Sequence, residues 1–141
     1  MRKTVQLLLV ASLYGCVATT PRPDAVDQRV NPIPFSLALE EVVTAGVRQR
    51  LPDPASARFG TILAGERTLS GRREIVVCGT VSAKTPSGGA DKAFVAKVYP
   101  DAGSSFDLVA MSDTTETRHI VGSTCSAAGL PIADPSPKTQ L

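Results

Sequence analysis

The residues that most constrain the fold are 74–84, which read Glu-Ile-Val-Val-Cys-Gly-Thr-Val-Ser-Ala-Lys. Side chains alternate across a β-strand, so positions 75, 77, 79, 81 and 83 give this stretch one apolar face. The opposite face is polar at both ends, but Val76 and Cys78 make its centre apolar. Because the apolar faces of a sheet must be buried, the stretch predicts a sheet with a covering layer on each side.

Residues 1–15 have the layout of a secretory signal peptide. Arg2 and Lys3 form a short basic start, and an apolar run follows at 5–13. This run is too short to cross a bilayer, which takes about 20 apolar residues. A basic start followed by a short apolar run is typical of a signal peptide, so we expect residues 1–15 to be removed on export.

The sequence Leu13-Tyr14-Gly15-Cys16 resembles the lipobox of bacterial lipoproteins, which has an aliphatic residue first, a small residue third and then an invariant cysteine. Tyr14 departs from the small residue that is usual at the second position. The resemblance implies that Cys16 becomes the acylated, palmitate-bearing N-terminus of the mature protein. With Val17 rather than Asp next, it also implies the outer membrane, with the domain facing the periplasm. Cleavage by the ordinary signal peptidase, after Gly15 or Ala18, is the alternative.

The rest of the chain divides into a tether, a domain and a tail. Residues 16–34 carry four prolines without apolar periodicity, which predicts a lipidated cysteine followed by an extended tether. The domain is expected at 35–129. Three more prolines in a polar run predict a disordered tail at 130–141.

The domain should open with an amphipathic helix at about 37–51. Ser36 is a suitable N-cap, and an apolar residue then recurs every four positions, at 39, 43, 47 and 51. Pro52 ends the helix, and Asp53-Pro54 predicts a single helical turn, with Asp53 as its cap, that leads into the first strand.

Four extended runs follow, at 59–68, 74–84, 92–99 and 106–111, and short turns join them. Such connections predict a four-stranded antiparallel meander, with the helix packed on its more apolar face. Asp113 and Glu116 have the spacing of a capping box, so residues 114–128 are predicted to be a short helix, with a fifth strand as the alternative. The fold class is therefore α+β.

If Cys16 carries lipid, Cys78 and Cys125 are the two remaining cysteines. In an oxidising compartment two such thiols pair by default, so we expect a disulfide that ties the C-terminal helix to the back of the sheet. The alternative is a metal site formed by both cysteines and His119. The spacing of these residues does not favour it, and we expect no metal and no cofactor.

Composition and side-chain chemistry favour a protein that is not an enzyme. The net charge is +2, but without Arg2 and Lys3 the chain carries 13 basic and 13 acidic residues, so its overall field attracts no nucleic acid. The single histidine, His119, could act as a general base oriented by Asp113 with a serine as nucleophile. A lone histidine on a short polar helix is more often a surface residue, so no catalytic residue is predicted.

The best candidates for contact with a partner lie at the end of the 74–84 strand and in the turn that follows. They are polar or small residues that short turns expose: Ser82, Lys84, Thr85, Gly88 and Gly89.

Three ordered motifs, DPASARF at 53–59, VCGTVSAK at 77–84 and Gly88-Gly89, resemble a family of small exported Gram-negative proteins. The family pattern is DPxSAxF followed by VCGxVNxKNxxGG, and its members are largely uncharacterised. Ser82 and Thr85 stand where the family has Asn. The resemblance implies an exported α+β domain with no assigned reaction.

These observations predict a non-enzymatic cell-envelope lipoprotein that acts as an interaction or structural accessory module. The membrane, through the lipid on Cys16, and an envelope protein are its expected partners. The alternative is a periplasmic inhibitor or binding protein for a wall enzyme or a wall fragment, which would use the turn at 82–89.

Overall fold

The computed structural model describes residues 28–133. The predicted signal peptide, the lipidated Cys16 and most of the predicted tether and tail lie outside these residues. Within residues 28–133, no helix is both long and apolar enough to cross a bilayer.

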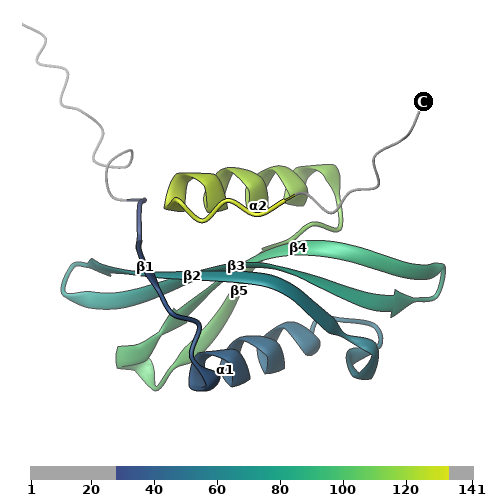
Figure 1. Ribbon diagram of the computed structural model, residues 1–141, viewed down its shortest axis with the longest axis horizontal. Coiled ribbons are helices and arrows are strands. Elements are labelled where there is room, and N and C mark those ends of the chain that lie inside the picture. The colour runs from purple at the N-terminus through teal and green to yellow at the C-terminus, as the bar shows by residue number, and fades with distance from the viewer. Residues whose placement is uncertain (1–27, 134–141) are drawn as a thin grey trace, which may run out of the picture.

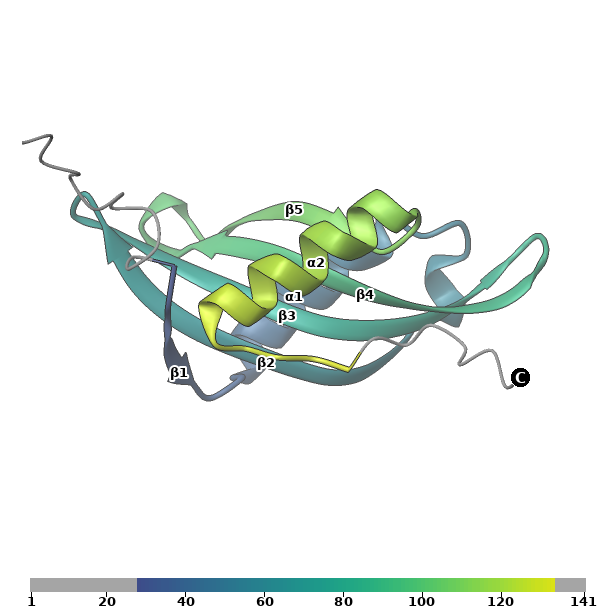
Figure 2. The same ribbon diagram turned by 90° about the horizontal axis from the view of Figure 1, so that it is seen from above.

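The described chain forms an antiparallel sheet with one helix on each face (Figure 1). The strands follow one another in chain order, β1-β2-β3-β4-β5, and α2 crosses the sheet obliquely on the face opposite α1 (Figure 2). The elements are β1 (Asn31–Ile33), α1 (Leu37–Arg48), β2 (Arg58–Leu69), β3 (Arg72–Thr85), β4 (Gly88–Tyr99), β5 (Ser105–Met111) and α2 (Thr115–Ala128), with 3-10 turns at Pro54–Ser56 and Pro100–Ala102. The predicted α+β class and antiparallel meander are confirmed.

Helix α1 begins as the sequence predicts and ends one turn earlier. The hydroxyl of Ser36 accepts a hydrogen bond from the backbone N–H of Leu39 at 3.3 Å, as an N-cap should. The helix ends at Arg48, although Leu51 beyond it is still buried against the same core. The turn at 54–56 forms without a side-chain bond from Asp53, whose carbonyl instead accepts bonds from Ser56.

The sheet has five strands, so the predicted count of four is wrong. Residues 31–33 form β1 and pair with β2 from Asn31↔Glu66 to Ile33↔Ala64. Gly65 makes this possible because a side chain there would lie 2.1 Å from a methyl carbon of Val30. Val30 is buried, so the packed region begins before the predicted boundary at residue 35.

Two apolar clusters lie on the two faces of the sheet. On the α1 face, Val43 and Val47 pack with Val77, Val81 and Phe94. On the α2 face, residues from β3, β4 and α2 meet around the two cysteines; the buried ones include Val76, Cys78, Val95, Val121, Cys125, Ala128 and Leu130. The two-sided burial of β3 that its sequence predicts is therefore confirmed.

A disulfide joins the two layers of the second cluster. The sulfurs of Cys78 on β3 and Cys125 on α2 are bonded at 2.09 Å, and both side chains are fully buried. The structure thus has the predicted disulfide, and the C-terminal helix lies behind the sheet as expected.

Helix α2 has a different cap from the predicted one. Thr114, not Asp113, is the N-cap, and its hydroxyl accepts a bond from the N–H of Thr117 at 3.1 Å. The Thr117 hydroxyl in turn accepts from the N–H of Thr114 at 2.9 Å, which completes a capping box without Glu116.

The chain stays packed for a few residues after α2. Gly129, at φ 78°, ends the helix, and the N–H of Leu130 donates to the carbonyl of Cys125 at 2.9 Å. Leu130 is buried and Ile132 packs beside it on the second cluster. The packed region therefore extends past the predicted boundary at residue 129.

Candidate functional site

The predicted contact residues lie at the end of the long β3–β4 hairpin. The turn itself is two residues, Pro86 and Ser87, because Thr85 pairs with Gly88 and Lys84 pairs with Gly89. Gly88 and Gly89 thus begin β4 and do not lie in the turn itself, where the sequence placed them. Figure 2 shows the end of this hairpin reaching past α2.

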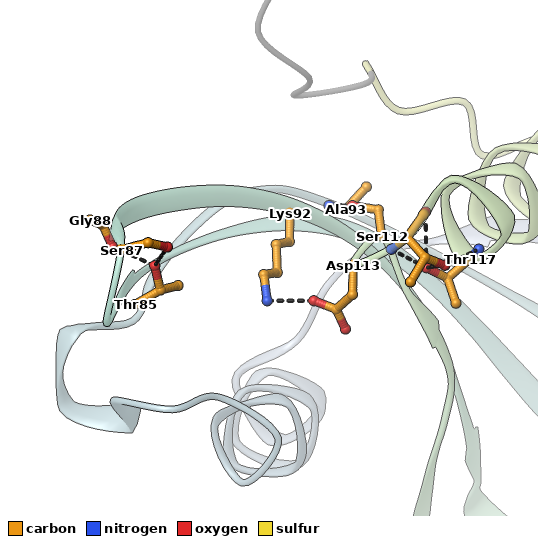
Figure 3. A network of polar contacts seen from close by, with 9 residues as sticks. Thr85, Ser87, Gly88, Lys92, Ala93, Ser112, Asp113 and Thr117 are labelled. Carbon is orange, nitrogen blue, oxygen red and sulfur yellow. Dashed lines mark hydrogen bonds and ion pairs between the residues drawn. The ribbon is translucent and has the colours of Figure 1, made fainter.

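The tip of the hairpin is held by its own side chains. The hydroxyl of Thr85 donates to the carbonyl of Gly88 at 2.7 Å and lies 3.3 Å from the hydroxyl of Ser87 (Figure 3). Gly88 has φ +123°, a conformation that a residue with a side chain rarely adopts. The position of Gly88 therefore accepts few substitutions.

The other two predicted residues lie further down β3. Ser82 donates its hydroxyl hydrogen to the Asp91 carboxylate across the hairpin. The backbone N–H of Lys84 donates to the hydroxyl of Ser56 at 2.9 Å, which ties the hairpin to the turn after α1. The side chain of Lys84 is exposed. Lys84, Gly88 and Gly89 are exposed, whereas Ser82 and Thr85 are half-buried, and Thr85 lies on the opposite face of β3 from Ser82 and Lys84. We call residues 82–91 the hairpin end.

A second polar network connects β4 to the start of α2. Lys92 forms an ion pair with Asp113, and the hydroxyl of Ser112 accepts from the N–H of Ala93 at 2.8 Å (Figure 3). Ser112 is buried, so this bond fixes where the chain leaves the sheet. The network positions α2 relative to the hairpin.

Two alternative sites included His119: a catalytic group with Asp113, and a metal site with Cys78 and Cys125. Within the described residues neither site is formed. Asp113, the residue that would orient the imidazole, is engaged by Lys92. His119 lies on the exposed side of α2. Cys78 and Cys125 are bonded to each other, so their sulfurs are not available as metal ligands. In the described part of the chain, no three His, Cys, Asp or Glu residues cluster as a metal site would require.

The sequence analysis missed a buried charge on the α2 face. Glu74, on β3, is buried, and its Oε1 accepts bonds from Nε and Nη2 of Arg67 at 3.0 and 2.6 Å. The ammonium of Lys97, on β4, lies 3.4 Å from the same oxygen. These three residues, the Glu74 cluster, link three neighbouring strands.

The pKa of Tyr99 is raised by burial and, in part, by the Glu74 cluster. Burial, and then the negative charges of Glu74 and Asp107, raise the pKa of Tyr99 above its ordinary value of 10.0. One part of the Glu74 cluster had a signal in the sequence. The turn at Ser70-Gly71 has a geometry that places Arg67 directly opposite Glu74.

A cleft of about 320 Å³ lies between α2 and the sheet beside this cluster. We call it the α2 cleft. Its walls combine two cations, three uncharged polar side chains and two small apolar ones: Arg67, Lys97, Gln28, Ser123, Thr124, Val76 and Ala128. No acidic residue of the described chain lines it.

Comparison with known proteins does not assign a function to the hairpin end or to the α2 cleft. No protein-family model matches the chain, and neither the curated proteins nor the solved structures give a significant match. The resemblances to lipoproteins and to small exported Gram-negative proteins therefore stay predictions.

Proposed function

We propose that this protein is a non-enzymatic, lipid-anchored module of the cell envelope, and that it binds an envelope protein through the hairpin end. The observation that carries the proposal is the exposure of Lys84, Gly88 and Gly89 at the end of a hairpin that reaches beyond α2. The lipid anchor rests on the sequence around Cys16, which lies outside the described residues.

The hairpin end has the properties of a recognition surface on a stable scaffold. Its backbone is fixed by the bonds of Thr85 and by the bond from Lys84 to Ser56, so binding would cost little conformational entropy. Apart from the chain neighbours, no atom of residues 28–133 lies within 4 Å of where a β-carbon would stand at Gly88 or Gly89, so a partner could approach the backbone closely there. The Lys84 side chain adds one exposed charge that could orient an acidic partner.

The same surface suits the alternative, an inhibitor of a wall enzyme. A rigid hairpin that enters a substrate groove can inhibit without any catalytic residue of its own. The two functions use the same contacts, so they differ in the partner and not in the site.

The proposal is tested by crosslinking and affinity purification of the full chain from envelope extracts. Lys84→Glu should reduce recovery of one envelope protein at least tenfold, because it reverses the exposed charge. Arg50→Glu, an equal charge change at an exposed position after α1, should leave recovery unchanged. Equal recovery with Lys84→Glu, or equal loss with both variants, would reject the hairpin end as the contact.

The anchor is tested separately. The unaltered chain should incorporate radiolabelled palmitate and fractionate with the outer membrane, whereas Cys16→Ala should incorporate none. Labelling that survives Cys16→Ala would refute lipidation at that residue. Adding the purified protein to wall-hydrolase assays distinguishes the inhibitor alternative, since inhibition should disappear with Lys84→Glu.

A further inference from the structure

We propose that the α2 cleft is a binding site for a small ligand that carries a single carboxylate, with Lys97 as its main cationic contact. This site lies on the α2 face, away from the hairpin end, and the inference does not depend on the proposed partner or on lipidation.

The lining of the cleft favours an anion. Both charged side chains in its walls are cationic, Arg67 and Lys97, and Ser123 and Thr124 line the same space, although the hydroxyl of Ser123 donates to the carbonyl of Ile120 at 3.2 Å. The acidic member of the cluster, Glu74, is not part of the lining. A ligand in the cleft would therefore meet a net positive charge, since two cations line it and the single carboxylate beside them, Glu74, lies outside the lining.

Glu74 fixes the position of Arg67 and leaves Lys97 with hydrogen-bond donors for a ligand. Its Oε1 accepts two N–H groups from Arg67 in a fork, which fixes the guanidinium against the sheet. Lys97 makes only a longer contact, 3.4 Å, with an oxygen that the fork already occupies. An ammonium group has three donors, so Lys97 keeps donors for a ligand. Its side chain is 26% exposed, enough for solvent or a ligand to reach it.

Size and partial burial argue for a small monoanion. The volume of about 320 Å³ lies at the lower end of the range for ligand pockets. Val76 and Ala128 provide an apolar patch for a short aliphatic substituent. One lysine with donors to spare matches one negative charge, whereas a phosphate dianion would need further cations to offset its desolvation.

The test is a titration of the ¹⁵N-labelled protein with N-acetyl-alanine, followed by backbone amide chemical shifts. Saturable shifts should map to the cleft walls, around Val76, Ser123 and Thr124. N-acetyl-alanine amide, which lacks the charge, should bind at least tenfold more weakly. Shifts that are not saturable, or that map elsewhere, would overturn the proposal.

Variants identify the contact. Lys97→Met keeps the stem and removes the charge, so the affinity should fall at least tenfold, while Lys97→Arg should stay within a few-fold. Thr124→Val, which keeps the shape of the cleft wall, should lower the affinity about threefold. This second variant tests the site even if Lys97→Met does not fold. Arg50→Gln, on another part of the surface, should change nothing. Unchanged affinity in both Lys97→Met and Thr124→Val would refute the site.

Inorganic phosphate distinguishes the two classes of oxyanion. Phosphate that competes only at concentrations well above those of N-acetyl-alanine would support the carboxylate assignment. Phosphate that binds as tightly or more tightly would overturn it.

Discussion

The Glu74 side chain, on β3, contacts Arg67 on β2 and Lys97 on β4. The position of this one carboxylate therefore depends on three neighbouring strands. Its side chain is 8% exposed, which means that it depends on these cations, and not on water, to offset its loss of hydration. Removing the charge leaves both cations without their shared partner.

We expect Glu74→Gln to lower the free energy of unfolding by about 2 kcal/mol, since breaking a largely buried ion pair on one side is costly. The measurement is urea denaturation at neutral pH. The matched control is Glu41→Gln, an exposed carboxylate on α1, which should stay within about 0.5 kcal/mol of the unaltered protein. Equal denaturation midpoints for the two variants would show that the cluster does not stabilise the fold.

At the scale of elements, α1 approaches β5 closely because residue 46 has no side chain. A β-carbon at Gly46 would lie 2.3 Å from the ring of Phe106. Propensity alone treats this glycine as a weakness in the middle of the helix. The packing shows that it is the point where the helix and the last strand come together.

Two glycine-to-alanine variants separate propensity from packing. Gly46→Ala should destabilise the protein by about 1–2 kcal/mol, because overpacking against Phe106 outweighs the gain in helix propensity. Gly122→Ala, in α2, should stabilise it by up to about 1 kcal/mol, because outside the helix's own backbone no atom of the described chain lies within 4 Å of the added β-carbon. Thermal unfolding of both variants gives the comparison. Stabilisation by both would mean that α1 does not pack on Phe106 as described.

The N-cap of α2 allows a prediction about the stability contributed by the start of this helix. Thr114→Ala removes the hydroxyl that accepts from the N–H of Thr117 and should cost about 1 kcal/mol. Thr115→Ala, one residue later and outside the capping box, should cost much less. Chemical denaturation of the two variants tests the assignment. A larger loss for Thr115→Ala would place the cap elsewhere.

Across the whole molecule, the features predicted correctly from the sequence are those with a local signal. Alternation along 74–84 identifies β3 and both of its buried faces, and a four-residue apolar repeat identifies α1. The features that were missed depend on contacts between distant segments. β1 has three residues and exists because Gly65 leaves room for Val30.

The missed parts of the candidate sites have the same origin. The Glu74 cluster requires the registers of β2, β3 and β4 together, so a single strand does not reveal it. The cap at Thr114 was missed because the pairing of Thr114 with Thr117 departs from the usual acidic capping box, while the Asp113 carboxylate pairs with Lys92 of β4. The prediction of a contact surface at the hairpin end rests on a local pattern, polar and small residues at the end of a strand.

The disulfide acts on the whole molecule because it joins β3, in the middle of the sheet, to α2. It closes a loop between residues 47 positions apart, so replacing both cysteines by alanine should lower the free energy of unfolding by roughly 4 kcal/mol in the chain-entropy model. Urea denaturation of Cys78→Ala/Cys125→Ala, compared with the unaltered protein with and without reductant, measures the loss. The reduced protein should unfold near the double variant. A double variant as stable as the oxidised protein would mean that burial of the second apolar cluster holds α2 without the bond.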